Sequence, residues 1–227
     1  MKLTTSELAK KIDQTLLKPF ATYEDLHKHC ETAAIYGFKT VAINNVHIPL
    51  CANILKGSGV LCDAAVSFPL GQSTLEIKVF ETCDAISKGA GEVDYVINIS
   101  ALKSGDWEYI RKEMSAIVTA CKSRGVVSKV IFENCYLTKA EICRLCDIAL
   151  DVRPTYIKTS TGFGTGGATI EDVRLMKQCV GNLVKIKAAG GIRSAQDALA
   201  FLDAGADRIG TSAGVAIIEQ YLDLSKK

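Results

Sequence analysis

Two lysines stand in runs of residues that suit chemistry on a carbonyl group. Lys158 lies in the run Tyr-Ile-Lys-Thr-Ser-Thr-Gly, and Lys187 lies in Val-Lys-Ile-Lys-Ala-Ala-Gly-Gly. Both runs are typical of buried strands that end in glycine. Burial removes hydration and lowers the pKa of a lysine, and a second ammonium nearby lowers it further. A neutral amine can attack a carbonyl and form an iminium, so the pair predicts one nucleophile and one lysine that lowers its pKa.

Lys185 competes with Lys187 for the second role. The two residues are two apart, so their side chains share one face of a strand and alternation does not choose between them. Lys187 lies nearer the C-terminal end of the strand, where a barrel carries its chemistry. We expect Lys185 to lie deeper or at the base, where a carboxylate could pair with it.

Two carboxylates fall in similar runs. Asp94 is a polar residue inside Glu-Val-Asp-Tyr-Val-Ile-Asn, and Glu133 ends the run Lys-Val-Ile-Phe-Glu. One interpretation of Asp94 is a structural ion pair that neutralises a buried lysine. The other is a proton shuttle beside the imine carbon, with Lys187 as its partner.

Glycine-rich turns follow the last three predicted strands and suit an anion. Glycine lets backbone N–H groups approach a phosphate without a Cβ in the way. Two of the turns lead into helix starts, at Ser194 and near Ala213, and helix N-termini attract phosphate. Arg193 either assists the anion or caps its loop. The candidate phosphate-binding residues are Gly162, Gly190, Gly191, Gly210 and Ser212.

Other motifs carry less chemistry. Cys143 and Cys146 form a C-x-x-C pair in a predicted helix, with no second pair and no histidine nearby, so neither zinc nor redox function is assigned. The three histidines lie in the first fifth of the chain without metal-binding spacing, and no metal site is predicted. Gly-x-Ser-x-Gly, the usual mark of a serine hydrolase, is absent.

Extended and helical patterns alternate along the whole chain. Helices are predicted from Ser/Thr residues followed three positions later by an acidic residue, at Thr22, Ser73 and Thr138, and from acidic first turns after Thr169 and Ser194. The predicted strands are a weak one at 12–17 and further ones at 40–43, 60–67, 92–99, 128–133, 155–160, 184–188 and 207–210.

This alternation predicts a parallel sheet covered by helices. A doubly wound sheet that binds a dinucleotide should show G-x-G-x-x-G after its first strand, and none is present near residues 42–45. The phosphate-type turns come late instead, as they do in barrels. We therefore expect an α/β fold, a single (β/α)8 TIM barrel with a short N-terminal helix, forming one domain over residues 1–227.

Composition and net charge favour a globular protein and argue against a nucleic-acid-binding or membrane protein. The 227 residues are 48% hydrophobic and 23% charged, with a net charge of +2, which suits a globular protein without a dedicated nucleic-acid surface. The first residues lack a secretory signal, and no run is long and apolar enough to span a bilayer. The nine cysteines suit reduced thiols, so we expect a cytoplasmic protein that contacts neither nucleic acid nor membrane.

Taken together, these motifs resemble the deoxyribose-phosphate aldolase family, a class I family that acts through a lysine Schiff base. The likeness covers almost the whole chain. It begins with Ile-Asp-Gln-Thr-Leu-Leu-Lys-Pro at residues 12–19 and includes Phe-Pro-Leu-Gly at 68–71 and Lys-Ser-Gly at 103–105. The runs around Lys158 and Lys187 are the longest and most specific matches.

The resemblance implies reversible cleavage of 2-deoxy-D-ribose 5-phosphate to D-glyceraldehyde 3-phosphate and acetaldehyde. By position, Lys158 matches the imine-forming lysine, and Asp94 and Lys187 match the pair that relays protons. Asp13 falls where a carboxylate orients the second lysine, and Thr161 also falls in a supporting position. No cofactor or metal is implied, because the iminium itself stabilises the carbanion; the expected partners are sugar phosphate and aldehyde substrates, and a homo-oligomer is a family-level expectation.

Some residues depart from the family pattern. Gln14 stands where a histidine is common, Ala42 where many members carry cysteine, and the tail ends without the C-terminal tyrosine of some members. Two alternatives remain. The first is another phosphate-binding barrel enzyme, such as a different class I aldolase or a sugar-phosphate isomerase, and an isomerase would need a base but no imine. The second is a catalytically silent sensor, which would bind the ligand without turnover.

Overall fold

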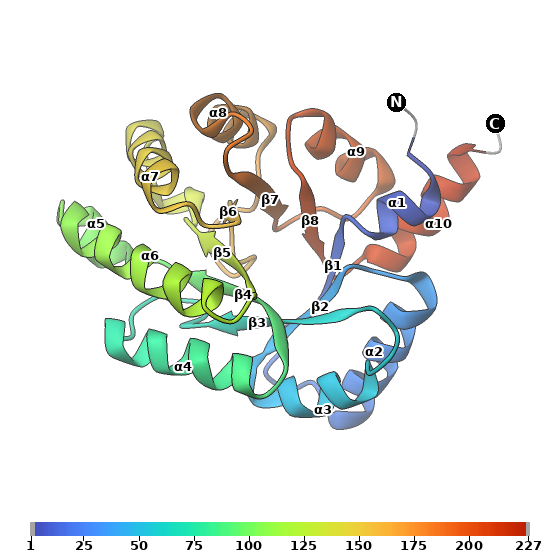
Figure 1. Ribbon diagram of the computed structural model, residues 1–227. Helices are drawn as coiled ribbons and strands as arrows, with labels where there is room; N and C mark the ends of the chain where they lie inside the picture. Colours follow the sequence, from blue (N-terminus) through green and yellow to red (C-terminus); the bar gives the residue numbers. More distant parts are fainter. Residues whose placement is uncertain (1–2, 226–227) are drawn as a thin grey trace.

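The computed structural model describes residues 3–225 as a closed barrel of eight parallel strands within a ring of helices (Figure 1). Each strand pairs with the next along the chain, and the first pairs with the eighth. This confirms the predicted (β/α)8 barrel over the open sheet. Residues 1, 2, 226 and 227, which belong to the predicted domain and to its tail, lie outside the described residues.

Strands and helices alternate from β1 to α10, with two helices, α5 and α6, between β4 and β5. The strands are β1 (Ile12–Leu16), β2 (Thr40–Asn44), β3 (Leu61–Val66), β4 (Ala90–Val96), β5 (Val127–Ile131), β6 (Tyr156–Lys158), β7 (Lys185–Ala189) and β8 (Arg208–Thr211). The helices are α1 (Thr5–Ala9), α2 (Tyr23–Tyr36), α3 (Ile48–Ile54), α4 (Leu75–Ser87), α5 (Ile99–Lys103), α6 (Trp107–Lys122), α7 (Lys139–Val152), α8 (Ile170–Val180), α9 (Ala195–Asp203) and α10 (Gly214–Ser225), with short 3-10 turns η1 (Asn45–His47) and η2 (Asn134–Tyr136).

The strands are buried on both faces, as their continuous apolar runs predict. Each helix buries one stripe; on α6 it includes Ile110, Met114, Ile117 and Cys121, at helical spacing. The predicted short N-terminal helix is α1, which packs beside α10 where the described termini meet (Figure 1). Among residues 3–225, no helix is both long and apolar enough to cross a bilayer.

The predicted helix starts are confirmed except for one. Thr22 and Thr138 form capping boxes with the acidic residue three positions later. Ser73 was the wrong cap for α4. The hydroxyl of the next residue, Thr74, accepts from the N–H of Ile77, which moves the helix start to Leu75.

A buried ion pair between α4 and α6 holds the C-terminal end of β4. Lys78 of α4 lies 2.6 Å from Glu113 of α6 and donates to the Val96 carbonyl at 2.8 Å. The other Glu113 oxygen accepts from the N–H of Asn98 at 3.0 Å. Both side chains are fully buried, so each satisfies the other where water cannot reach. The pair therefore ties two helices to the end of the strand that carries Asp94.

Candidate active site

Lys158 is the last residue of β6 and lies just below the floor of a cavity at the C-terminal end of the barrel. Its Nζ lies 2.5 Å from Oδ2 of Asp94 and 6.0 Å from the ring centre of Phe68. Only 6% of the side chain is exposed, and it lines the cavity that the βα loops enclose. The amine is therefore reachable from the cavity while its stem is buried.

Asp94 joins the two predicted lysines. The Nζ of Lys187 lies 2.7 Å from the same Oδ2 that contacts Lys158, and the Nζ of Lys129 lies 2.7 Å from Oδ1. Strand register explains the meeting, because Lys158 pairs with Lys187 across β6 and β7, and Asp94 pairs with Lys129 across β4 and β5. Three residues that are far apart in the sequence thus meet around one carboxylate.

Lys187 is held from below by two more carboxylates. Its Nζ lies 2.6 Å from Asp13 and 3.0 Å from Asp63. Asp13 in turn accepts from the guanidinium of Arg208 at 2.6 Å. Asp13 therefore lies where the sequence placed a supporting carboxylate, in contact with the second lysine.

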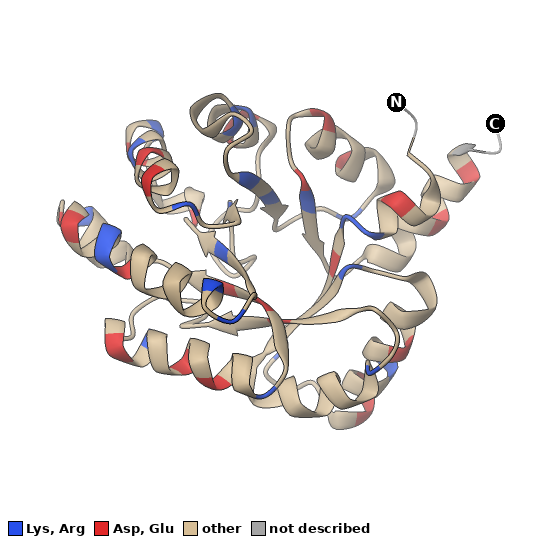
Figure 2. Cartoon of the chain, in the orientation of Figure 1, with Lys and Arg blue, Asp and Glu red and all other residues tan. Residues whose placement is uncertain are grey.

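The barrel interior carries more charge than the sequence analysis recognised. The residues that it missed are Asp63, Glu92, Lys129 and Arg208, all at most 4% exposed. Figure 2 shows blue bands on β7 and β8, inside the ring of helices. The signal was present in the sequence, since each is a charged residue inside an otherwise apolar strand. Such a residue must find a partner of opposite charge in the interior.

Charge balance in this cluster governs its pKa values. Burial alone would raise the pKa of the Asp94 carboxyl, but Lys129, Lys158 and Lys187 outweigh burial and hold that pKa well below its usual range. Burial likewise favours the neutral form of Lys187, but Asp13, Asp63 and Asp94 outweigh it and raise the pKa of Lys187 above its ordinary value. Lys187 therefore stays an ammonium, and Asp94 a carboxylate, at neutral pH.

Lys158 is shifted in the opposite direction from Lys187. Burial lowers the pKa of Lys158, Asp94 opposes that effect, and the charge on Lys187 lowers the pKa further. The difference between the two lysines is their number of acidic neighbours. Lys158 contacts one carboxylate that it must share with two other lysines, whereas Lys187 contacts three. Lys158 is thus the lysine with the larger neutral fraction.

Asp63 carries the excess negative charge of the cluster. Four buried carboxylates face three side chains that stay positively charged, so a neutral Lys158 leaves one negative charge uncompensated. The carboxylates are Asp13, Asp63, Glu92 and Asp94, and the cations are Lys129, Lys187 and Arg208. Burial and the neighbouring Asp94 raise the pKa of Asp63 to about 6, although Lys129 and Lys187 act against the rise. Asp63 is therefore the carboxylate most ready to take a proton.

The carboxylates of Asp13, Asp63 and Glu92 are close enough together to hold a metal ion, with one oxygen from each within 4.8 Å of the others. The same carboxylates already contact the side-chain cations of Lys129, Lys187 and Arg208 at 2.6–3.0 Å. A metal ion would have to displace these cations, so we assign the cluster to side-chain ion pairs.

The cavity above Lys158 has a volume of about 550 Å³ and brings together the predicted phosphate-binding residues. Its lining includes Gly162, Gly190, Gly191, Gly210 and Ser212, together with Thr161. Two of the glycines are required by geometry. Gly190 has φ +88° and a Cβ there would lie 2.9 Å from the Cα of Gly167; a Cβ on Gly210 would lie 3.0 Å from Cε of Lys187.

Two side chains from other strands hold the loops of this cavity. Glu133, in the left-handed conformation after β5, accepts from both the N–H and the hydroxyl of Thr161. The amide of Gln14 donates to the Ser212 carbonyl at 3.3 Å and accepts from the N–H of Gly214 at 3.0 Å. Gln14, noted as a departure from the family pattern, thus fixes the loop that leads into α10.

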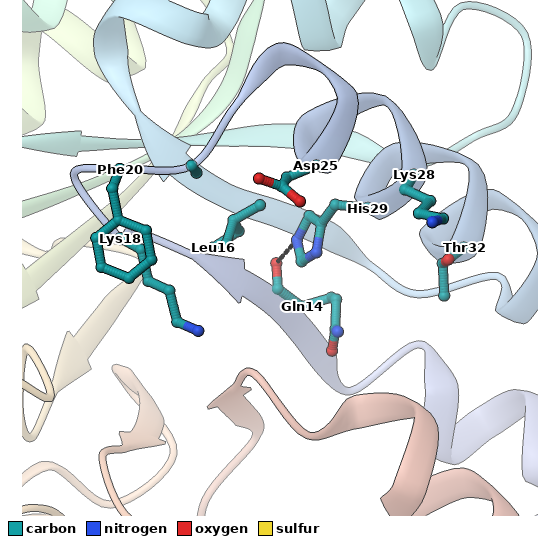
Figure 3. Close-up of a pocket in the computed structure, with 9 residues that line it drawn as sticks. Gln14, Leu16, Lys18, Phe20, Asp25, Lys28, His29 and Thr32 are labelled. Atoms are coloured by element: carbon teal, nitrogen blue, oxygen red, sulfur yellow. Dashed lines mark hydrogen bonds between the residues drawn. The ribbon is translucent and has the colours of Figure 1, made fainter.

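No carboxylate lines this cavity within the part of the chain that the structure describes, whereas Lys18 and Arg193 do. Lys18 was missed as a site residue because it belongs to the loop after β1. Figure 3 shows it in an adjoining pocket of about 350 Å³, where Nε2 of His29 donates to the Gln14 carbonyl at 3.1 Å. Burial lowers the pKa of His29, which keeps its ring uncharged. The lining of the cavity therefore carries positive charge from Lys18 and Arg193.

Lys185 lies at the base of the barrel, one of the two places expected for it. Its side chain is exposed, and its Nζ lies 5.7 Å from the ring centre of Tyr156 rather than on a carboxylate. Because β7 begins at Lys185, the residue never enters the buried part of the strand. Of the two candidate lysines, Lys187 alone contacts Asp94.

The fold and the site together define a barrel enzyme with a buried lysine at the edge of its cavity. The sequence profile of the DeoC/LacD family of aldolases matches residues 7–220. The chain therefore belongs to the DeoC/LacD aldolase family. It is an aldolase, a lyase of carbon–carbon bonds, as are its relatives named deoxyribose-phosphate aldolase.

The chain is similar over nearly its full length to deoxyribose-phosphate aldolases of two bacteria. It is 56% identical to that of Lactobacillus acidophilus over 96% of this chain and 92% of the relative, and 50% identical to that of Bacteroides thetaiotaomicron over 99% and 94%. The solved tetrameric structure of deoxyribose phosphate aldolase from Aeropyrum pernix is 35% identical, with a TM-score of 0.91 over 98% of this chain and 94% of that chain. These similarities confirm the resemblance inferred from the sequence motifs.

Replacing Asp63 with asparagine should change how stability depends on pH. The pKa of Asp63 is about 6 in the folded protein and 3.8 without burial, so between these values only the folded state holds the proton. Wild-type stability then falls as pH rises through this window. Asparagine cannot titrate. We therefore expect the unfolding free energy of Asp63→Asn, relative to that of the wild type, to be about 2–3 kcal/mol higher at pH 7 than at pH 4.

Urea unfolding of both proteins at several pH values measures this difference. The absolute stability of Asp63→Asn is not at issue, because only its change with pH relative to the wild type matters. A constant difference between the two proteins across the window would show that Asp63 does not carry the excess charge.

Proposed function

We propose that this aldolase reversibly cleaves 2-deoxy-D-ribose 5-phosphate to D-glyceraldehyde 3-phosphate and acetaldehyde through a Schiff base on Lys158. One observation carries the proposal: a buried lysine with a lowered pKa lies beneath a cavity that suits a phosphate and shares one carboxylate with a second, charged lysine. The named activity of the relatives supports the substrate.

Lys158 begins the reaction. Its neutral amine attacks the C1 aldehyde of the open-chain sugar to give a carbinolamine, whose hydroxyl takes a proton and leaves as water, so that a protonated imine forms. The positive nitrogen then accepts the electrons of the C2–C3 bond as this bond breaks, while the C3 hydroxyl loses its proton. D-glyceraldehyde 3-phosphate leaves, and an enamine remains on Lys158. Protonation of C2 and hydrolysis of the imine release acetaldehyde.

Asp94 and Lys187 are placed to move the protons. Asp94 lies 2.5 Å from the Lys158 nitrogen, so its carboxylate can accept a proton beside the imine. Lys187 lies on the same carboxylate oxygen and can return a proton from its ammonium group. Asp13 holds Lys187 from the other side and keeps it charged. Asp94 and Lys187 thus act together as one relay, with Asp13 as its support.

The phosphate occupies the other end of the cavity. Gly162, Gly190, Gly191 and Gly210 offer backbone N–H groups, and Ser212 adds a hydroxyl before the N-terminus of α10. Lys18 and Arg193 line the same cavity and contribute positive charge. Thr161 connects this end to the reacting end, because it follows Lys158 by three residues and is anchored by Glu133.

We also propose that the chain forms a homo-oligomer, as the tetrameric Aeropyrum pernix relative does. Val46 and Phe80 are 79% and 70% exposed on neighbouring elements, which the Asn45–Glu81 hydrogen bond joins. Burying such side chains favours association. Light scattering of the purified protein tests this proposal, and a monomer mass would contradict it.

Lys158→Ala should abolish cleavage. Without the amine there is no covalent intermediate, so we expect the release of acetaldehyde from 2-deoxy-D-ribose 5-phosphate to fall by roughly 10³-fold or more. Retention of activity near the wild-type level would contradict the nucleophile assignment. Folded wild-type protein that binds the sugar phosphate without releasing either aldehyde would contradict the proposed reaction.

Lys187→Leu should slow the reaction and move its pH profile. Loss of a general acid costs on the order of 10²-fold or more in kcat/KM. Removing the positive charge also raises the pKa of Lys158, so the rising limb of kcat/KM should move to higher pH. Lys185→Leu is the matched control, because Lys185 is exposed at the barrel base. A limb that stays in place in Lys187→Leu, or moves equally in the control, would refute the coupling.

Ser212→Glu should discriminate against the phosphate. A carboxylate at this end of the cavity repels the phosphate dianion, so KM should rise more for 2-deoxy-D-ribose 5-phosphate than for free 2-deoxy-D-ribose. Ser123→Glu, on the exposed end of α6, should leave both KM values unchanged. Equal increases for both sugars with Ser212→Glu would place the phosphate elsewhere.

A further inference from the structure

Three cysteines outside the active site gather where α7 and α8 pack against each other. Cys143 and Cys146 lie one turn apart on α7, and Cys179 lies on α8. The Sγ atoms of Cys143 and Cys179 are 3.4 Å apart, and the Cys179 thiol donates to the Cys143 sulfur. The hydrogen-bond partner of the Cys143 sulfur therefore lies on the next helix.

The packing of α7 on α8 keeps these two sulfur atoms together. Both helices run antiparallel to the barrel strands, so they are parallel to each other. Near their N-terminal ends, Lys139 of α7 forms an ion pair with the largely buried Asp172 of α8. One turn further along α7, Cys143 meets Cys179. The 3.4 Å that separates the two sulfur atoms would shorten to about 2.05 Å in a disulfide.

Accessibility separates this pair from the other close cysteines of the described chain. Cys30 and Cys51 also interact, but both are completely buried. Cys146 is fully buried as well, whereas Cys143 and Cys179 are each partly exposed. Burial and the hydrogen bond to Cys143 raise the pKa of Cys179 to about 11. Cys179 therefore stays a thiol, and its S–H donates to the partly exposed sulfur of Cys143, which we take as the one that meets an oxidant first.

We propose that Cys143 and Cys179 form a reversible disulfide when the protein meets a hydroperoxide, and that this bond staples α7 to α8. The Cys143 sulfur attacks one peroxide oxygen, and the O–O bond breaks. Water or an alcohol is released, and Cys143 becomes a sulfenic acid. The Cys179 sulfur then attacks the Cys143 sulfur, the S–O bond breaks, and the departing hydroxide takes the thiol proton to form water. Two thiols lose two electrons, and the peroxide gains them.

The disulfide should stabilise the folded state and leave the active site unchanged. It closes a loop of 36 residues that contains all of β6, the strand of Lys158. Closing this loop restricts the unfolded chain, which stabilises the folded state. Both sulfur atoms lie in the helix layer, outside the charged barrel interior. The oxidised protein should therefore melt at a higher temperature with its active site unchanged.

Treatment of the purified wild-type protein with hydrogen peroxide, followed by intact-mass measurement and tryptic mapping without reductant, tests the proposal. We expect a loss of about 2 Da, reversed by dithiothreitol, as two thiol hydrogens leave. Trypsin cuts after Arg144, which separates Cys143 from Cys146. The expected linked product joins the peptide of residues 140–144 to the peptide of residues 178–185.

Cysteine variants supply the controls. Oxidation should raise the Tm of the wild type and of Cys146→Ser by on the order of 5 °C or more, with aldolase activity within about twofold. Neither Cys143→Ser nor Cys179→Ser should show the mass loss or the rise in Tm. A link between Cys146 and Cys179, oxygen added to either cysteine without a cross-link, or an unchanged mass would each overturn the proposal.

Discussion

The carboxylate of Asp94 is shared by three lysines, and this sharing determines which of them has a lowered pKa. Each ammonium group that contacts Asp94 reduces the stabilisation that is left for the others. Lys129 and Lys187 have further carboxylates of their own, whereas Asp94 is the one carboxylate of residues 3–225 that Lys158 contacts. The group with the fewest acidic partners is the one whose pKa falls. The same competition raises the pKa of Asp63. The neutral amine of Lys158 and the readiness of Asp63 to take a proton therefore belong to the same charge balance.

The barrel makes this arrangement by strand register. Side chains at matching positions of neighbouring parallel strands point to the same interior, which brings Asp63 beside Glu92, Asp94 beside Lys129 and Lys158 beside Lys187. Burying so many charges is costly, and ion pairing from all sides offsets the cost. Above this cluster the loops line the cavity with glycines and with Lys18 and Arg193. No carboxylate among residues 3–225 is part of that lining.

Much of the fold and site followed from the sequence for definite physical reasons. Apolar runs bounded by capped helices predicted eight strands, and late glycine turns favoured the barrel over an open sheet. The lysine runs and the family motifs predicted Lys158, Asp94 and Lys187, which meet at 2.5–2.7 Å. Asp63, Glu92, Lys129 and Arg208 were missed as site residues, although Glu92 and Lys129 begin the runs that contain Asp94 and Glu133. Their contacts depend on the register between strands, which no local pattern specifies.

Lys18 and Cys179 were missed for a related reason. Lys18 lies in a loop, and its place at the cavity depends on how that loop folds back over β1. Cys179 meets Cys143 only because α7 and α8 pack side by side. Ser73 shows the limit of local patterns too, since a hydroxyl on the next residue made the cap.

Trapping with acetaldehyde and sodium borohydride tests the central claim most directly. If Lys158 is neutral and reactive, acetaldehyde forms an imine that borohydride reduces to a stable ethyl group, adding about 28 Da, and peptide mapping places it on Lys158. Lys158→Ala should gain no mass under the same conditions. An ethyl group on Lys187 would contradict the assignment of roles within the charge cluster. No adduct on folded wild-type protein would contradict the Schiff-base mechanism itself.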